Sequence, residues 1–431
     1  MARFFTPEWI CLLLFFLSYT LFVLFPNRRS WTACGGALLL VLTGVAPWRE
    51  ALFEMISWNV IGLFCGTLVL ADLFLQSRVP VVIAQALVER APSTRMAMMA
   101  LCALSGVISI FVENVAVVLL VAPVALSLTE RLKMNPAPLL IGIAISSNVQ
   151  GTATMVGDPP SMILAGFMKM GFWDFFIYQG KLSIFFAIQA GAIASLVVLF
   201  FIFRKYGKRE QISFDEKARS WVPSILLVIL IVGLSLASVI DPEFKWFAGC
   251  YTLFLSVVGL IWYRFAAKWG RIRPLLRTKD WDTAICLVGV FVLAGGLGAS
   301  GWLDKLGQWL SGAVGGSVFL VFLCVILFSV LVSGFVDNVP FLLVMLPVCM
   351  RMAEQLHVSV QLLLFGLLIG ACLGGNITPI GASANVVTLG LLRKRGITVT
   401  FADFMRISIP FTLAALTFGA LFVWLVYGGA R

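Results

Sequence analysis

Two acid and amide pairs stand in otherwise apolar sequence at a fixed distance from each other. The stretch Phe-Val-Glu-Asn-Val at 111–115 recurs as Phe-Val-Asp-Asn-Val at 335–339, which is 224 residues later. An ionised carboxylate inside a membrane costs about 2.5–3.5 kcal/mol on insertion scales, so Glu113 and Asp337 need a reason to be there. The functional reason is binding of a proton or a cation, and Na+ would find further oxygens on Asn114 and Asn338. The structural alternative is that each acid caps the helix that follows it.

A second pair of polar segments follows these acids. Gly-Thr-Ala-Thr-Met-Val-Gly at 151–157 recurs as Gly-Asn-Ile-Thr-Pro-Ile-Gly at 375–381, again 224 residues later. Glycines and prolines there would unwind a helix, and hydroxyl and amide side chains would then be open to a solute. The alternative is a packing interface of small residues, which we favour for Gly366, Gly370 and Gly374. The candidate substrate- and ion-binding residues of the two segments are Asn148, Gly151, Thr152, Thr154, Asp158, Asn376, Thr378, Ser383 and Asn385.

The composition is that of a membrane protein. Of the 431 residues, 61% are hydrophobic and only 12% are charged, against about 25% charged residues in soluble domains. The net charge of +11 comes from Lys and Arg in short loops between apolar spans, as topology signals do, so we expect no nucleic-acid partner. The nine cysteines stand singly without a CxxC pair, so we expect no metal site, and no motif calls for a cofactor.

Other functional classes lack their motifs. There is no GxxxxGK[ST] for ATP-driven transport by this chain alone, and no HExxH for a metalloprotease. The acids occupy duplicated positions rather than converging on a nucleophile, so no catalytic residues are expected. Asp72 is one more acid in an apolar span, and it is open whether it carries protons or lies near the cytoplasmic surface.

The apolar segments predict an all-α polytopic membrane protein, because a spanning helix needs about 20 apolar residues. Two pairs of shorter apolar legs predict re-entrant helical hairpins at 96–130 and 317–353, with the acids at their tips, and polar interruptions predict broken helices at 138–168 and 361–392. Continuous spans are expected near 9–25, 31–47, 57–75, 182–203, 222–240, 244–262, 283–300 and 407–428.

The duplication divides these elements into two repeats. Each repeat has five crossings, and because five is odd the second must be inverted relative to the first. The repeats are residues 1–203 and 222–431, joined by a basic cytoplasmic linker at 204–221. With both termini outside, the loops 26–30, 76–95, 129–137, 204–220, 263–282 and 393–406 face the cytoplasm and hold 23 of the 31 Lys and Arg residues. The chain is therefore expected in the cell inner membrane with extracytoplasmic termini.

These motifs resemble those of the ion transporter superfamily, in the branch that holds arsenite permeases, D-type Na+/H+ antiporters and the melanosomal P protein. The stretch from Asn114 through Gly-Thr-Ala-Thr-Met-Val-Gly-Asp-Pro-Pro-Ser161 is similar to the first signature of that branch. Asp337-Asn-Val-Pro with Gly-Gly-Asn-Ile-Thr-Pro-Ile-Gly-Ala-Ser-Ala-Asn-Val-Val387 is similar to the second. The resemblance implies two inverted repeats with re-entrant hairpins, a moving transport domain on a static scaffold, a homodimer and, as a further candidate partner, a separate ATPase subunit. Glu113 stands where the branch usually has Asp.

The charged tips lead to a functional prediction. Carboxylates there suit protons, a cation or a neutral solute better than a polyanion. The first choice is an arsenite/antimonite efflux permease that is coupled to H+ and works by alternating access. The alternatives within the fold are a Na+/H+ antiporter and a sodium-coupled carboxylate or inorganic anion transporter. A passive channel or a membrane-embedded enzyme are the alternatives from other classes.

Overall fold

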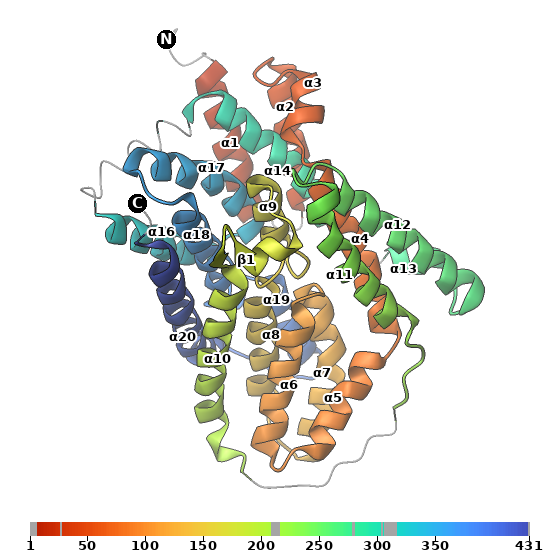
Figure 1. Cartoon of the computed structure of the whole chain (residues 1–431). Coiled ribbons are helices and arrows are strands. Elements are labelled where there is room, and N and C mark those ends of the chain that lie inside the picture. The colour runs from red at the N-terminus through yellow and green to blue at the C-terminus, as the bar shows by residue number, and fades with distance from the viewer. Residues whose placement is uncertain are drawn as a thin grey trace.

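A computed structural model describes residues 7–25, 28–207, 216–277, 281–302, 305 and 317–429 (Figure 1). Among these residues, eight helices are long and apolar enough to cross a membrane. The described strands are one short antiparallel pair, Ile177–Tyr178 with Lys181–Leu182. The all-α prediction is confirmed. The middle of the expected linker, residues 208–215, and residues 26–27 of an expected loop lie outside the described residues.

The first half of the chain contains the helices that the apolar pattern predicts, and two others, at 48–50 and 79–90. They are α1 (Pro7–Leu24), α2 (Arg29–Leu42), α3 (Trp48–Glu50), α4 (Trp58–Gln76), α5 (Val79–Arg90), α6 (Thr94–Ser109), α7 (Asn114–Arg131), α8 (Ala137–Gly151), α9 (Pro159–Met168) and α10 (Ile184–Ile202). Helix α5 lies within 76–95, which was expected to be a loop. Pro80 stands in its first turn, where a missing amide costs nothing, and Val79 and Ala84 are buried.

The second half repeats this order. Its helices are α11 (Val222–Ile240), α12 (Phe247–Ile261), α13 (Ile272–Arg277), α14 (Trp281–Ala299), α16 (Val318–Ser333), α17 (Asn338–Leu356), α18 (Val360–Gly374), α19 (Ser383–Lys394) and α20 (Phe401–Tyr427). Helices α6 and α7 form one hairpin, and α16 and α17 form the other. Helix α8 breaks off before α9, as α18 does before α19.

The two repeats are inverted, as the final helix of each repeat shows. Tyr427, at the end of α20, donates its hydroxyl over 3.2 Å to the carbonyl oxygen of Leu182, which lies just before α10. Further along, Gly191 of α10 lies against Ala415, while Gly419 of α20 lies against Ala187. The partner number falls as the residue number rises, so these equivalent helices run antiparallel. The inverted repeat is therefore confirmed.

Small residues allow the other repeat-related helices to pack closely. On α4, a Cβ added to Gly66 would lie 2.6 Å from Thr252 of α12, and on α14 one added to Gly289 would lie 2.5 Å from Ala33 of α2. The pairs α4 with α12 and α14 with α2 are thus equivalent contacts between the repeats. In α18, Gly366, Gly370 and Gly374 face α16, with 2.7 Å between a Cβ on Gly374 and the Cα of Val330. The packing role predicted for these glycines is confirmed.

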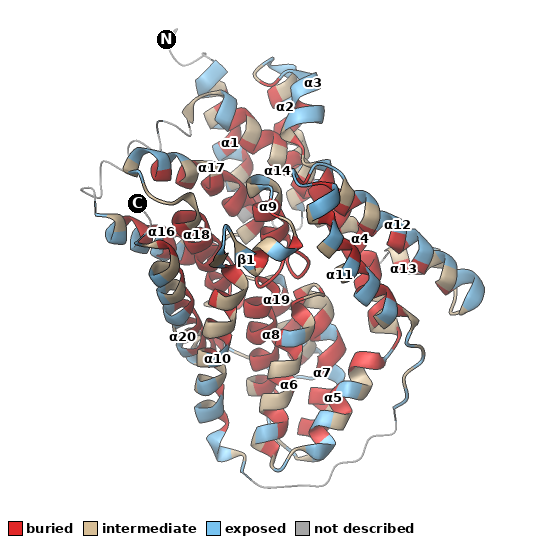
Figure 2. Cartoon of the chain, in the orientation of Figure 1, coloured by how far each residue is buried: buried red, intermediate tan, exposed pale blue. Residues whose placement is uncertain are grey.

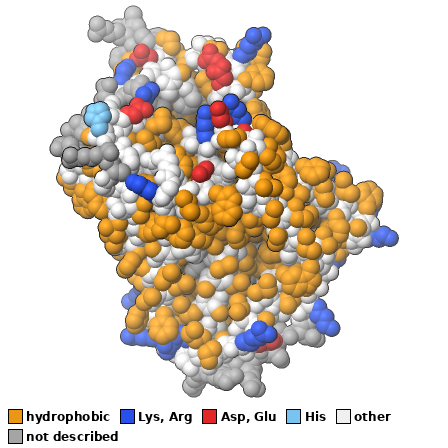
Figure 3. Space-filling view, viewed as in Figure 1, with side chains coloured by type: hydrophobic (Ala, Val, Ile, Leu, Met, Phe, Trp, Pro, Cys, Tyr) orange, Lys and Arg blue, Asp and Glu red, His pale blue; other side chains and the backbone are white. Residues whose placement is uncertain are grey.

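The broken helices occupy the centre of the molecule. Every residue of α8 from Leu139 to Gly151 is buried, and α18 is buried from Leu362 to its end (Figure 2). Exposed large apolar side chains lie instead on the outer helices α11, α12 and α20, among them Val239, Phe254 and Leu425. The space-filling view shows an apolar belt with most charged side chains toward its two ends (Figure 3). This distribution matches a protein whose flanks face lipid.

The turn between α11 and α12 gives a testable pH effect. Asp241 accepts hydrogen bonds from the backbone amides of Lys245, Trp246 and Phe247, over 2.7–3.0 Å. Burial alone would raise the pKa of Asp241, but the three amides and the Lys245 ammonium hold this pKa below its ordinary value of 3.8. The carboxylate therefore stabilises the folded state above that pH and stops doing so as the pH falls through the lower folded-state pKa.

We expect Asp241→Asn to lower the thermal unfolding temperature at neutral pH, because an amide has no negative charge and one accepting oxygen in place of two. Thermal unfolding of the two proteins in detergent across an acid titration measures the effect. The gap between them should close at strongly acidic pH, and a gap that stays constant would contradict this role of the charge.

Candidate functional site

Each hairpin turns at its acid, which caps the second helix. Glu113 has an extended ψ of 139° and accepts the amide of Ala116 over 3.1 Å, at the start of α7. Asp337 has a ψ of 129° and accepts the amide of Val339 over 3.1 Å, at the start of α17. The capping alternative therefore describes both acids. Each cap uses only one of the two carboxylate oxygens, so a capping acid can have a second role.

The two breaks are tied to these tips by equivalent bonds. Thr154, between α8 and α9, donates its hydroxyl to the carbonyl oxygen of Ile110 over 2.5 Å. Thr378, between α18 and α19, donates to the carbonyl oxygen of Gly334. Ile110 and Gly334 end the first helix of each hairpin, so each break is held beside its own tip. These carbonyls would otherwise lack intrahelical partners.

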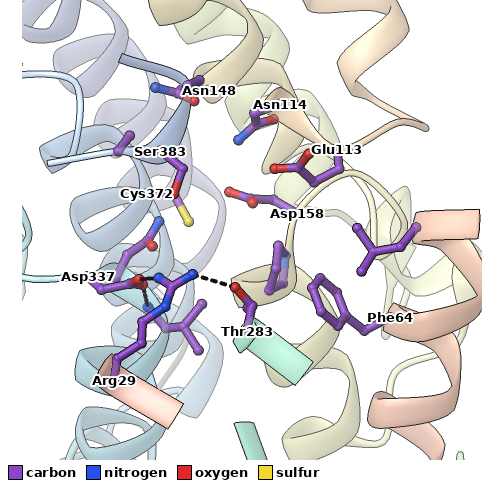
Figure 4. Close-up of a pocket in the computed structure, with 16 residues that line it drawn as sticks. Arg29, Phe64, Glu113, Asn114, Asn148, Asp158, Thr283, Asp337, Cys372 and Ser383 are labelled. Atoms are coloured by element: carbon purple, nitrogen blue, oxygen red, sulfur yellow. Dashed lines mark hydrogen bonds and ion pairs between the residues drawn. The ribbon is translucent and has the colours of Figure 1, made fainter. Parts of the chain in front are cut away.

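The tips and breaks enclose one small polar cavity of about 60 Å³ (Figure 4). This volume suits several water molecules or one small solute. Helices from both repeats contribute to it, since α2, α4 and α14 face the hairpin tips across the cavity. The side chains lining it are Arg29, Phe64, Leu68, Glu113, Asn114, Asn148, Asp158, Pro159, Thr283, Asp337, Asn338, Val339, Cys372, Ala382, Ser383 and Ala384.

Seven of the predicted site residues line this cavity: Glu113, Asn114, Asn148, Asp158, Asp337, Asn338 and Ser383. They come from regions more than 200 residues apart, and Figure 4 shows Glu113 and Asp158 close to one another. Asp158 is only 8% exposed, at the start of α9. The duplicated acids and the breaks are thus brought to one place.

The other predicted residues lie behind the cavity, where the protein itself uses their polar groups. The side chain of Asn148 donates to Asn376 over 2.8 Å and to Asn385 over 3.2 Å. Asn385 donates in turn to the carbonyl oxygens of Gly375 and Thr378. The residues outside the lining are Gly151, Thr152, Thr154, Asn376, Thr378 and Asn385. Their contribution to solute binding stays a prediction. In the structure they lie at the two breaks and fix the shape of these segments.

Arg29 is a cavity residue that the sequence analysis missed. It was expected to be a topology signal in the loop 26–30, but its guanidinium lines the cavity. It forms ion pairs with Asp337 at 2.5 Å and with Asp282 at 3.1 Å, and it donates to Thr283 over 2.6 Å. Asp282 and Thr283 begin α14. No sequence signal links Arg29 to partners about 250 and 310 residues away.

Three carboxylates and one guanidinium therefore define the electrostatics of the cavity. Glu113, Asp158 and Asp337 supply the negative charge. Among the described residues of the lining, Arg29 alone is basic. Such a site can hold protons or a cation, and it can admit an anion once enough of the acids are neutral. Asp72 does not line the cavity, and it accepts a hydrogen bond from Gln76 over 2.9 Å.

The chain is similar to known transporters over nearly its whole length. A family model described as citrate transporter matches residues 19–266 and 255–430. An uncharacterized transporter of Mycobacterium tuberculosis is 27% identical over 97% of this chain and 98% of its own. One from Synechocystis is 28% identical over 91% of this chain and 92% of its own. The mouse P protein is 24% identical over 95% of this chain and 59% of its own.

Solved structures share the fold. The YdaH transporter of Alcanivorax borkumensis superposes with a TM-score of 0.62 at 15% identity, over 97% of this chain and 98% of its own. MtrF of Neisseria gonorrhoeae, described as illuminating a class of antimetabolite efflux pumps, gives a TM-score of 0.57 at 13% identity, over 90% of this chain and 84% of its own. At these identities the likeness concerns the fold.

Proposed function

We propose, starting from the fact that this chain belongs to the citrate transporter family, that it is a proton-coupled secondary active transporter whose solute binds between the two hairpin tips. The resemblance to the ion transporter superfamily is confirmed, and because the family consists of transporters, a membrane enzyme is excluded as an alternative. The observation that carries the proposal is the cavity that Glu113, Asp158 and Asp337 share. Alternating access would expose this cavity to each side in turn.

Protons are the coupling ion that the lining favours. A charged carboxylate at this depth costs about 2.5–3.5 kcal/mol, so proton uptake by these acids is coupled to how far the site is open to water. Asn114 and Asn338 lie in the same lining and could add oxygens for Na+. Na+/H+ antiport is therefore an outcome that the transport assay below distinguishes.

For the solute we favour a carboxylate or a similar oxyanion that moves with protons. The family description names citrate, and the Arg29 guanidinium in the lining suits carboxylate oxygens. Sequence reasoning disfavoured an anion because it did not include this cation. A volume of about 60 Å³ fits one carboxylate group, so the cavity would have to open further for a tricarboxylate.

Arsenite/antimonite efflux is the second candidate, and the small cavity favours it. Arsenous acid is neutral near pH 7 and carries hydroxyls that Ser383 and the Asn side chains could bond. The thiol of Cys372 also faces the cavity (Figure 4), and As(III) has affinity for such soft ligands.

Four further expectations from the sequence stay predictions. They are the homodimer, the separate ATPase subunit, the location in the cell inner membrane and the extracytoplasmic position of both termini.

The candidates separate in everted membrane vesicles that carry a pH-sensitive dye. We expect citrate to start proton movement and to accumulate in response to a pH gradient. Proton movement on addition of arsenite alone would assign the second candidate, and on addition of Na+ alone it would assign antiport. Solute entry that ignores the pH gradient but needs Na+ would assign sodium-coupled transport, and entry that ignores both would indicate a passive channel. Either result would contradict the proposal. Vesicles from cells that lack the protein are the control.

A further inference from the structure

The guanidinium of Arg29 is held by two different parts of the molecule. Its Nε pairs with Asp282 and its Nη2 donates to Thr283, both at the start of α14. Its Nη1 pairs with Oδ2 of Asp337, at the tip between α16 and α17 (Figure 4). Asp282 is anchored in turn by the hydroxyl of Ser30. One edge of the guanidinium is therefore held by α14, and Nη1 is paired with Asp337.

The charges in this cluster change with a single proton. With Asp282 and Asp337 both ionised, the cluster carries one net negative charge and repels an incoming anion. A proton on Asp337 makes these three groups neutral overall and removes the ionic attraction between Asp337 and Nη1 of Arg29. A carboxylate or an inorganic oxyanion can then replace the Asp337 carboxylate, because a guanidinium binds such groups through parallel N–H bonds. With one anionic group bound, the cluster again carries one net negative charge.

The hairpin tip stays in place during this exchange. Oδ1 of Asp337 accepts the amide of Val339, and a protonated carboxyl group can still accept that bond. The hydroxyl of Tyr19 on α1 donates to the carbonyl oxygen of Pro340, in the first turn of α17. Both bonds hold the start of α17 beside Arg29 in either protonation state.

We propose that Arg29 is the anion-binding residue of the cavity and that Asp337 is its internal competitor, so that one proton on Asp337 admits one carboxylate or oxyanion group. This inference rests on the proposed proton-coupled transport and assigns Arg29 a role in selecting the solute. Acids that stay ionised repel a second anionic group, which limits the bound anion further. The titratable and charged groups that face Asp337 are Arg29 on α2, Tyr19 on α1, Asp282 and Cys286 on α14, Glu113 at the first tip, Asp158 at the start of α9 and Cys372 on α18.

The test is binding of citrate, malate, sulfate and phosphate to the purified full-length protein in nanodiscs, at mildly acidic and mildly alkaline pH. We expect the wild type to bind at least one of these anions more tightly at acidic pH. Arg29→Gln should weaken this binding by about tenfold or more, and Arg29→Lys should lose less because it keeps the charge without the planar fork. Asp337→Asn should lose most of the pH dependence of sulfate binding, because its tip is always neutral and sulfate keeps its own charge over this range. Glu113 and Asp158 account for what remains.

Arg28→Gln is the matched control, since Arg28 is the exposed neighbour of Arg29, and it should behave as the wild type. The inference is overturned if no anion binds the wild type, if Arg29→Gln binds as the wild type does, or if sulfate binding to Asp337→Asn follows pH as strongly as in the wild type. If Arg29→Gln does not fold, the pH response of Asp337→Asn decides.

Failure of this inference is distinguishable from failure of the proposed function. Proton movement with arsenite or Na+, but with none of the four anions bound, would leave proton-coupled transport standing and remove the role of Arg29. PH-dependent anion binding at Arg29 without any proton movement across vesicles would do the reverse.

Discussion

Replacing Glu113 with Gln, or Asp337 with Asn, is expected to abolish transport driven by a pH gradient while the protein accumulates normally. Each amide keeps an oxygen that can accept the capping bond from Ala116 or Val339, so the second hairpin helix still starts correctly. What each substitution removes is the group that takes up the proton. Gradient-driven uptake into vesicles should fall by about 100-fold or more, which corresponds to about 2.8 kcal/mol.

Glu130→Gln provides the control for these variants. Glu130 is an exposed acid at the end of α7 that pairs with Arg395 at 3.1 Å. Such surface pairs contribute about 0–1 kcal/mol, so this variant should transport normally. Loss of protein in the tip variants alone would indicate that capping is the main role of the acids. Unchanged gradient-driven transport would contradict proton binding at the tips.

Adding one methyl group at either break is expected to destabilise the folded protein strongly. A Cβ on Gly157 would lie 2.5 Å from the carbonyl oxygens of both Gly151 and Ser109, and on Gly381 it would lie 2.7 Å from that of Gly375. Backbone atoms cannot move aside as the end of a side chain can. Gly157→Ala and Gly381→Ala should each destabilise the protein by about 3 kcal/mol, the upper end of the usual cost of overpacking. Yield and thermal unfolding temperature in detergent measure this effect.

Gly390→Ala is the matched substitution in α19. No heavy atom lies within 4 Å of a Cβ at this position, and Ala favours a helix over Gly by about 1 kcal/mol. This variant should be as stable as the wild type or more stable. Equal stability of all three variants would mean that the breaks are not as tightly closed as the structure has them.

The periodic and duplicated features of this fold follow from the sequence. Apolar runs placed the long helices such as α4, α11 and α20, because a bilayer requires about 20 apolar residues. The repeated acids predicted the positions of the hairpin tips, and the repeated glycines predicted the positions of the breaks. Inversion followed from an odd number of crossings, and the antiparallel α10 and α20 confirm it.

What the sequence could not show depends on pairing between distant residues. In the sequence, Arg29 looks like one more cation of a loop. Only the structure shows that it pairs with Asp337 and Asp282. The sequence also could not show that the hydroxyls of Thr154 and Thr378 donate to the carbonyl oxygens of Ile110 and Gly334. Helix α5 has the length of neither a span nor a hairpin leg. Such contacts follow from the tertiary fold rather than from local pattern.

The central claim is that solute and protons move together through the acid-lined cavity. Proteoliposomes with purified protein, equal pH on both sides and a citrate gradient test it most directly, with internal pH and labelled citrate followed in the same sample. We predict that the citrate gradient alone moves protons in a fixed ratio to citrate, and that Asp337→Asn removes the proton movement. Citrate movement without any change in internal pH in the wild type would contradict proton coupling, and so would an unchanged proton ratio in Asp337→Asn.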